Sequence, residues 1–246
     1  MPLPCACRVV AWAVHPLVRL ISLGPLQISS RRKNIDLNNV LEYYSRMKKL
    51  NTRHGATKEK KRQIIHAALV CFTEKGYSET RIADICTRCN ANTGSIYHHF
   101  KSKEMLAAQV YLEGIRDYQT GFLGVLEDQE EAREGIFSLV RYHLEWVEKN
   151  PHWARFLIQK RHAEFMGAAA DRFNELNKAF MGGCADWFGP HISAGRLRTL
   201  PREVFVSILL GPCQEYSRLM VSGVVGTLDQ EDIEALGLAA WKALRN

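Results

Sequence analysis

The sequence lacks the long apolar run that a membrane helix requires, because no such stretch reaches the roughly 18 residues that cross a bilayer. Proline is scarce, at 8 of 246 residues, and no segment alternates with period two for long enough to predict a strand. The seven cysteines are an odd number without the spacing of a disulfide framework, which fits the reducing cytoplasm. These absences favour an all-α cytoplasmic protein.

Enzymatic signatures are also missing. The chain has no Gly-rich phosphate loop, no HExxH zinc motif and no GxSxG nucleophile motif, so we expect no catalytic activity and no cofactor. Cys86-x-x-Cys89 has the spacing of half a zinc site or of a redox pair, but no second close Cys or His pair completes a tetrahedral zinc site. Both cysteines fall on the apolar face of a predicted helix, which favours packing, and we predict no metal site.

The net charge of +7 is unevenly distributed. Residues 1–50 hold 8 Lys and Arg against 2 Asp and Glu, and residues 51–110 hold 10 against 5. Residues 111–246 hold 15 against 19. A basic front and an acidic back are typical of a polyanion-binding module joined to a body that does not touch the polyanion, although chance can also produce such a split.

Residues 1–56 do not resemble part of a folded domain. The apolar segment 1–23 is short, is interrupted by charged residues and proline, and lacks the basic region that precedes the apolar part of a secretory signal. Met47 begins a sequence that would suit the start of a DNA-binding domain. We therefore expect residues 1–46 to be a translated leader or a disordered tail; the alternative is a basic arm that follows the DNA backbone.

Helical periodicity dominates the rest of the chain. Apolar spacing predicts helices over 57–75, 103–126, 130–149, 151–165, 171–187, 201–222 and 228–244, with a loop over 189–200. Gly76 suits the left-handed residue that follows a helix end. Four cations open the first helix against its dipole, which indicates either an external anion or a solvated helix end: Lys58, Lys60, Lys61 and Arg62.

Residues 80–106 contain two short helical patterns joined by a tight turn. The first pattern places apolar residues at i, i+3, i+4 and i+7: Ile82, Ile85, Cys86 and Cys89. Thr80 is the predicted N-cap of this helix, Asn90 suits the left-handed turn, and Asn92 is the predicted cap of the second helix, whose Ile96 and Phe100 should face inward. A helix, a short turn and a second helix form the unit that places its second helix in a DNA major groove.

Residues 58–106 resemble the DNA-binding domain of the TetR family of bacterial transcription regulators. The resemblance rests on AALVCFTEKGYSET, RIADICTRCNANTGSIYHHF and KSKEML. The chain departs from the family pattern by placing cysteines where alanines are usual, Asn90 for the turn glycine and Ala91 for a valine. None of these changes should abolish the fold. The resemblance implies a three-helix head over 57–106 with its motif at 81–100, followed by a helical effector-binding and dimerisation bundle over 107–246.

The predicted DNA contacts combine this resemblance with side-chain chemistry. Thr93 and Ser95 stand at the start of the second helix, where short polar side chains reach base edges or phosphates. Tyr97 and one of the two adjacent histidines can donate to phosphates, whereas His99 could equally hold the helices together. The predicted set is Arg81, Thr93, Ser95, Tyr97, His98, His99 and Lys103.

The predicted body is rich in aromatic residues, which at helical spacing belong more often to a core than to a pocket. The resemblance nevertheless implies an effector cavity, and small-molecule sites are mostly apolar with few polar groups. The candidate pocket residues are His143, Trp146, Trp153, Phe156, Gln159, His162 and Phe180. The resemblance also implies a homodimer through the last two helices, with candidate interface residues Phe205, Ile208, Leu209, Tyr216, Met220, Ile233, Leu236, Ala240 and Trp241.

The sequence therefore predicts an all-α, homodimeric transcription regulator that binds a double-stranded, palindromic DNA operator. The resemblance implies a repressor that a small-molecule effector, unknown from the sequence, releases from its operator. The alternative is a helical small-molecule-binding protein without operator binding.

Overall fold

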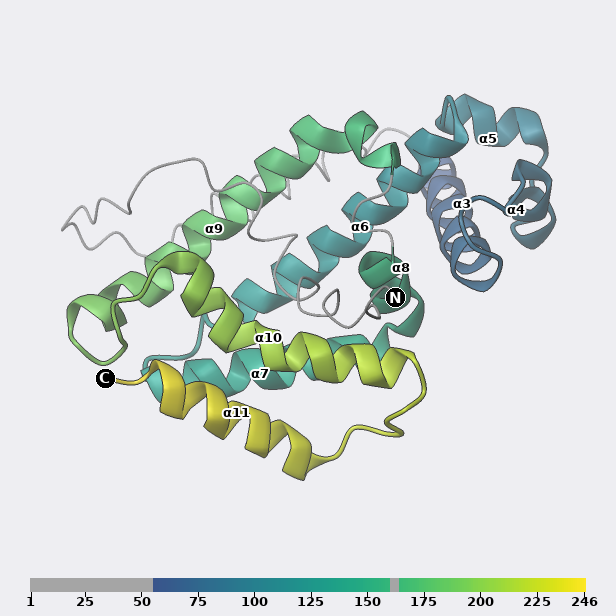
Figure 1. The fold of residues 1–246 in the computed structure, drawn as a ribbon. Helices are drawn as coiled ribbons and strands as arrows, with labels where there is room; N and C mark the ends of the chain where they lie inside the picture. Colours follow the sequence, from purple (N-terminus) through teal and green to yellow (C-terminus); the bar gives the residue numbers. More distant parts are fainter. Residues whose placement is uncertain (1–54, 160–163) are drawn as a thin grey trace, which may run out of the picture. The chain divides into compact units, whose positions relative to one another are not determined.

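The computed structural model describes residues 55–159 and 164–246, and the predicted N-terminal tail lies almost entirely outside these ranges. The described chain is helical, as predicted, with a single isolated bridge between Leu197 and Arg245 as its only extended pairing. No helix of the described residues is both long and apolar enough to span a membrane. The helices are α3 (Gly55–Glu74), α4 (Ile82–Arg88), α5 (Thr93–His99), α6 (Lys103–Gly124), α7 (Ala132–Lys149), α8 (Pro151–Gln159), α9 (Ala170–Ser193), α10 (Arg202–Val221) and α11 (Gln230–Leu244), with a 3-10 turn η1 (Glu164–Ala169) before α9 (Figure 1).

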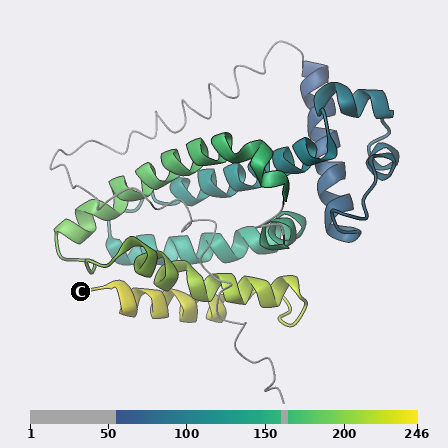
Figure 2. The ribbon, with the colours of Figure 1, turned by 45° about the horizontal axis from the view of Figure 1, so that its top comes forward.

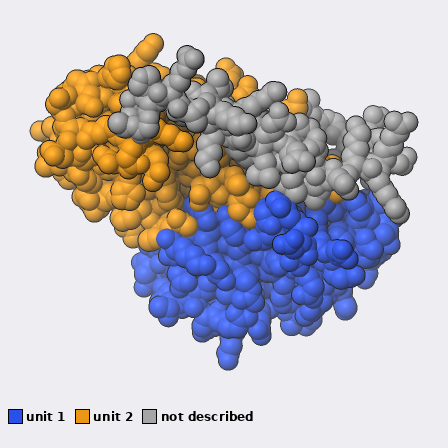
Figure 3. Space-filling model, turned by 180° about the vertical axis from the view of Figure 1, so that it is seen from behind, with its two compact units in different colours: residues 1–31, 124–149, 187–246 blue, residues 32–123, 150–186 orange. Residues whose placement is uncertain are grey.

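Contacts divide the chain into two compact units, which Figure 3 colours separately. Of the described residues, unit 1 comprises 124–149 and 187–246, and unit 2 comprises 55–123, 150–159 and 164–186. Unit 2 thus combines the predicted head with α8 and parts of α6 and α9. The predicted functional boundary between residues 106 and 107 stays a prediction.

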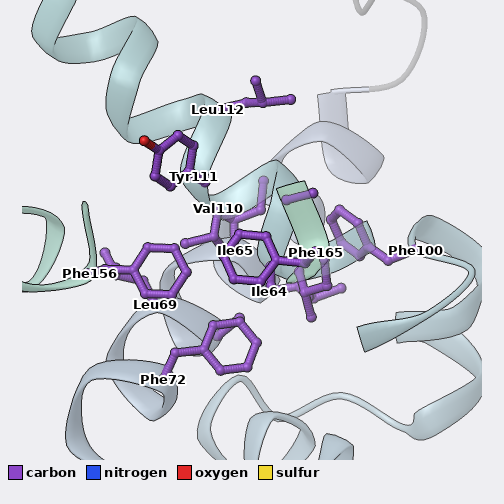
Figure 4. Close-up of a cluster of buried hydrophobic side chains, with 14 of the residues drawn as sticks. Ile64, Ile65, Leu69, Phe72, Phe100, Val110, Tyr111, Leu112, Phe156 and Phe165 are labelled. Carbon is purple, nitrogen blue, oxygen red and sulfur yellow. The ribbon is translucent and has the colours of Figure 1, made fainter. Parts of the chain in front are cut away.

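Unit 2 has one continuous hydrophobic cluster (Figure 4). Phe72 of α3 stacks on Phe156 of α8, with ring centroids 5.8 Å apart, and Phe156 stacks in turn on Phe165 of η1 at 6.0 Å. Tyr111 of α6 meets the same Phe165 ring edge-on at 6.5 Å. Because aromatic rings bury large apolar areas, this stack joins the first helix of the unit to α6, α8 and η1 in one core.

Unit 1 is built on α7, α10 and α11, which lie side by side in Figures 1 and 2. Leu139, Val140 and Leu144 of α7 are fully buried. The start of α7 lies very close to Trp187 of α9: a Cβ added to Gly135 would stand 2.1 Å from the Trp187 ring. The Trp187 indole donates a hydrogen bond to the Gln129 carbonyl at 2.9 Å, which fixes the ring against the glycine.

The predicted start of the loop at residue 189 was wrong, because α9 continues through Pro190 to Ser193. Proline removes one backbone donor but tolerates helical φ angles. His191 beyond it is buried and packs on Trp187, with ring centroids 4.3 Å apart. Packing of this last turn therefore outweighs the local cost of the proline.

Candidate nucleic-acid interface

The first short helix, α4, starts at Ile82, and its N-cap lies one residue later than predicted. Arg81 is its N-cap, and the Arg81 backbone N–H donates to the Asp84 carboxylate at 2.8 Å. The Asp84 carboxylate also accepts from Lys75 at 2.7 Å, and this hydrogen bond, followed by the one from Arg81, lowers the pKa of Asp84. The Thr80 cap was wrong: Thr80 is buried, and its hydroxyl donates to the carbonyls of Cys71 and Gly76 instead.

The turn after α4 has the predicted left-handed residue. Asn90 has φ of +46°, and the Ala91 N–H donates back to the Cys86 carbonyl at 3.0 Å. This is the pattern of a Schellman motif, which closes a helix end by satisfying its last carbonyls. The turn thereby delivers the chain into α5 with a fixed direction.

The second helix, α5, is capped as predicted. The Asn92 side chain accepts a hydrogen bond from the Ser95 backbone N–H at 2.7 Å. Ile96 and the C-cap residue Phe100 are buried, 1% and 4% exposed, and lock the inner face of the helix into the unit 2 core. The opposite face is left for solvent, which is the arrangement that a groove-reading helix requires.

The outer face of α5 exposes polar and aromatic side chains. Thr93, Tyr97 and His98 are exposed, and Ser95 is half-buried beside its cap. Tyr97 is 46% exposed, so part of this residue is accessible to a ligand. The predicted contact residues of α5 therefore lie on or beside one accessible surface of the helix.

His99 differs from its neighbour. It is half-buried, with its ring 6.2 Å from the Phe100 ring and 5.2 Å from the His98 ring. Burial lowers the pKa of His99, and the nearby His98 and Lys61 lower it further. A neutral, half-buried imidazole supplies less attraction for a phosphate than an exposed cation, which favours a packing role for His99.

Lys103 is held by the protein itself. Its ammonium donates to the carbonyls of Ser78 at 3.2 Å and Thr80 at 2.9 Å and lies 4.6 Å from the Tyr77 ring centroid. A lysine has three N–H donors, so one remains for a phosphate. Lys103 thus connects the start of α6 to the segment that precedes α4. Arg81, the N-cap of α4, is exposed.

Sequence reasoning missed the role of Lys60. Its ammonium reaches from α3 to the carbonyls of Cys89 at 3.0 Å and Asn90 at 3.1 Å. A cation at a helix C-terminus is favoured by the helix dipole, so Lys60 stabilises the end of α4 and the turn. Residues about thirty positions apart are involved, and no local pattern indicates such a contact.

Comparisons with known proteins agree with this geometry. Residues 64–110 match the family model described as bacterial regulatory proteins, tetR family. The described fold matches a TetR family transcription regulator from Marinobacter aquaeolei VT8 with a TM-score of 0.68 and 16% identity, over 77% of this chain and 97% of that one. Residues 64–110 therefore form a tetR-type DNA-binding domain.

One of two sequence relatives matches a stretch of this chain longer than the helix-turn-helix domain. The biofilm operon icaADBC HTH-type negative transcriptional regulator IcaR of Staphylococcus aureus (strain Newman) is 26% identical over 125 residues, which cover 48% of this chain. The uncharacterized HTH-type transcriptional regulator YerO of Bacillus subtilis (strain 168) is 44% identical over 48 residues, covering 20% of this chain and 17% of its own. The chain spans 64% of the length of IcaR.

The predicted effector residues that the structure describes are divided between the two units. His143 and Trp146 are buried on α7 in unit 1, and the His143 Nε2 lies 3.2 Å from the Ser217 hydroxyl. Burial lowers the pKa of His143 to about 4. In unit 2, Phe156 belongs to the core stack and Phe180 packs on Phe122 at 5.3 Å. Trp153 packs closely on Gly114, while the Gln159 side chain and His162 lie outside the described residues.

A polar pair that the sequence did not single out lies between α6 and α9. The Gln119 amide donates to the Asn177 side-chain oxygen at 2.8 Å, and both residues are at least 95% buried. The Gln119 side-chain oxygen is buried without a hydrogen-bond partner within the described chain. A buried acceptor of this kind costs about 1–3 kcal/mol, so it marks a place where a bound donor would stabilise the protein.

The predicted dimer residues divide into two groups. Four of them are buried within one chain, so they serve the core of unit 1: Phe205, Leu209, Ile233 and Ala240. Five are half-exposed: Ile208, Tyr216, Met220, Leu236 and Trp241. Val204 and Leu238 are 43% and 40% exposed on the same two helices, and sequence reasoning left both out of the candidate interface.

Proposed function

We propose that the protein is a sequence-specific DNA-binding transcription regulator that represses its target genes. The observation that carries the proposal is α5, whose inner face is locked by Ile96 and Phe100 while Thr93, Tyr97 and His98 stay accessible. IcaR, to which the chain is similar, is a negative transcriptional regulator, and this similarity supports repression as the direction of control. We propose that the protein acts in the cytoplasm, where it would reach DNA.

Phosphate contacts should supply much of the affinity, because α5 has no Arg and no Asn within its own span. Arg81, Tyr97 and His98 are the accessible donors, and Thr93 and Ser95 are the proposed base readers. Lys103 contributes its remaining N–H, while its larger role is to hold the helix-turn-helix in place. His99 is proposed as a supporting residue of the surface.

We propose a homodimer through the half-exposed faces of α10 and α11. A two-fold axis would place two copies of α5 about one DNA turn apart, roughly 34 Å, on a palindromic operator. Exposed Val204 and Leu238 support this surface, because large apolar side chains are favoured at interfaces.

An effector in the helical body would release the operator by a population shift. The contact between α3 and α8 supports this coupling: Phe72 stacks on Phe156, and the Thr73 hydroxyl lies 2.9 Å from the His152 Nδ1. A ligand that prefers one position of α8 would therefore also bias the head. The unsatisfied Gln119 oxygen is our proposed polar anchor for a largely apolar effector that carries a hydrogen-bond donor.

A gel-shift experiment with the DNA that flanks the protein's own gene tests the proposal. We expect a specific shift that competitor DNA of unrelated sequence does not remove, and we expect a small-molecule extract of the cells to reverse it. A helical ligand-binding protein without operator binding would give no shift but would bind components of the extract. Turnover of an extract component, with no shift, would instead indicate an enzyme.

A further inference from the structure

The two cysteines of α4 occupy the joint between the helices of the motif. Cys86 lies two residues before the last residue of α4, Arg88, and Cys89 is the C-cap residue, with φ of −103° and ψ of 11°. Both are free and only half-buried, whereas Ile85 beside them is fully buried and supplies the core contact of the helix. Packing therefore explains Ile85 better than it explains the exposed parts of the two thiols.

One of the two thiols lies beside the start of α5. The Cys86 Sγ lies 3.8 Å from the Thr93 hydroxyl at the first residue of α5. The Cys86 carbonyl accepts from Ala91, and the Cys89 carbonyl accepts from Lys60. The carbonyls of both residues thus take part in the Schellman turn, and the Cys86 sulfur lies against the start of the recognition helix, α5.

We propose that Cys86 and Cys89 form a reversible disulfide in the presence of a peroxide, and that this disulfide releases α5 from its DNA-binding position. The Cys86 thiolate attacks one oxygen of hydrogen peroxide, the O–O bond breaks, and a sulfenic acid and a hydroxide ion form. The hydroxide takes up the proton that the Cys86 thiol released, which gives one water. The Cys89 sulfur then attacks the Cys86 sulfur, the S–S bond forms, and a second water leaves. The two thiols supply the two electrons that reduce one hydrogen peroxide to two waters, and an external thiol reverses the reaction.

This order of attack follows the surroundings of the two sulfurs. Burial raises the pKa of the Cys89 thiol, and the Lys60 ammonium offsets part of this effect. Cys86 lies at the exposed contact with Thr93, where a peroxide can reach it. Cys89 is therefore the thiol that resolves the sulfenic acid.

The disulfide cannot form without moving the turn. Residues i and i+3 of a helix have Cβ atoms about 5–6 Å apart, whereas a disulfide requires about 3.5–4.5 Å. The C-cap residue must therefore move toward Cys86, which disturbs the Ala91 and Lys60 hydrogen bonds of the Schellman turn. Because this turn sets the direction of α5, oxidation changes the position of the DNA-reading surface.

The experiment treats the full-length protein with hydrogen peroxide and maps its disulfides by mass spectrometry of proteolytic peptides. We expect a Cys86–Cys89 disulfide, faster amide hydrogen exchange over residues 89–95, and recovery on addition of dithiothreitol. DNA binding, which rests on the proposed function, should weaken about tenfold or more, as judged with the duplex flanking the protein's own gene. Cys86→Ser and Cys89→Ser should bind DNA like the reduced protein and lose the peroxide response, whereas Cys184→Ser should keep it.

Two failures are distinguishable. If the reduced protein binds no DNA, the proposed function fails, while peptide mapping and hydrogen exchange still test the disulfide. If no Cys86–Cys89 disulfide forms, or if it forms and leaves both exchange and DNA binding unchanged, the switch is overturned.

Discussion

Single side chains set the geometry of the helix-turn-helix more than its short helices do. Asn90 takes the left-handed conformation that turns the chain, and Lys60 caps the carbonyls of that turn from another helix. Lys103 does the same for the segment before α4. Two seven-residue helices are too short to be stable alone, so these individual contacts and the buried Ile85 and Ile96 hold them.

Asn90 gives the sharpest test at this scale. Asn90→Ala should lower the free energy of unfolding by about 1–2 kcal/mol, because a Cβ-bearing residue without a short polar side chain is disfavoured at positive φ. Asn90→Gly should be as stable as the wild type or slightly more stable, because glycine adopts this conformation freely. Urea denaturation measures both, and equal stability of the Ala and wild-type proteins would refute the account of the turn.

Lys60 provides a second test. Lys60→Met keeps the apolar stem but removes two charged hydrogen bonds to the turn, and we expect a loss of about 1 kcal/mol because the site is partly exposed. The matched control is Lys58→Met, two residues earlier on the same helix, which should change stability little. An equal effect of the two substitutions in thermal unfolding would contradict a specific capping role.

Two helices approach each other closely where a glycine of one helix faces a fixed aromatic ring of the other. Gly135 of α7 meets Trp187, whose indole is fixed by the Gln129 carbonyl. Gly182 of α9, by contrast, has open space around its missing Cβ. The same change of residue should therefore have opposite effects at the two positions.

Gly135→Ala should destabilise the protein by about 1–3 kcal/mol, because the added Cβ would force Trp187 out of place. Gly182→Ala should be neutral or stabilise by up to about 1 kcal/mol through better helix propensity. Calorimetric unfolding compares the two, and tryptophan fluorescence reports the ring. A neutral Gly135→Ala would show that the ring at Trp187 can move.

The contact of α7 with α10 contains a pH-dependent group. Burial lowers the pKa of His143 to about 4 in the folded protein, below its value of about 6.5 in the unfolded chain. Neutral, buried His143 therefore contributes fully to the free energy of unfolding above pH 6.5. This contribution, roughly 3 kcal/mol in total, is lost as the pH falls from 6.5 toward 4.

His143→Gln should flatten this part of the stability profile, because glutamine does not titrate while it can still bond the Ser217 hydroxyl. The free energy of unfolding, measured by urea denaturation at several pH values, gives the comparison. Identical slopes between pH 6.5 and 4 for wild type and variant would show that His143 is not the responsible group.

Across the whole molecule, the sequence was sufficient to predict the all-α class, nearly every helix, and the two faces of α5. Periodicity and caps are local, so Asn90, Asn92 and Gly76 were predictable from neighbouring residues. The Thr80 error and the missed Lys60 and Lys103 contacts share one cause: their partners lie distant in sequence or depend on tertiary packing. The aromatic residues of α8 were candidates for either the core or a pocket, and Phe156 packs against Phe72 because α8 lies on α3.

The central claim is that the outer face of α5 binds DNA. Fluorescence anisotropy with a labelled duplex from the DNA flanking the gene, titrated over a range of salt concentrations, tests it with wild type, Ser95→Ala and Tyr97→Ala. We predict that the logarithm of the binding constant falls linearly with the logarithm of the salt concentration. The slope should be about −0.9 for each phosphate contact, with about four contacts per subunit. We also predict binding about tenfold weaker for each variant at unchanged thermal stability. Wild-type affinity in both variants, or a salt slope near zero, would contradict this claim.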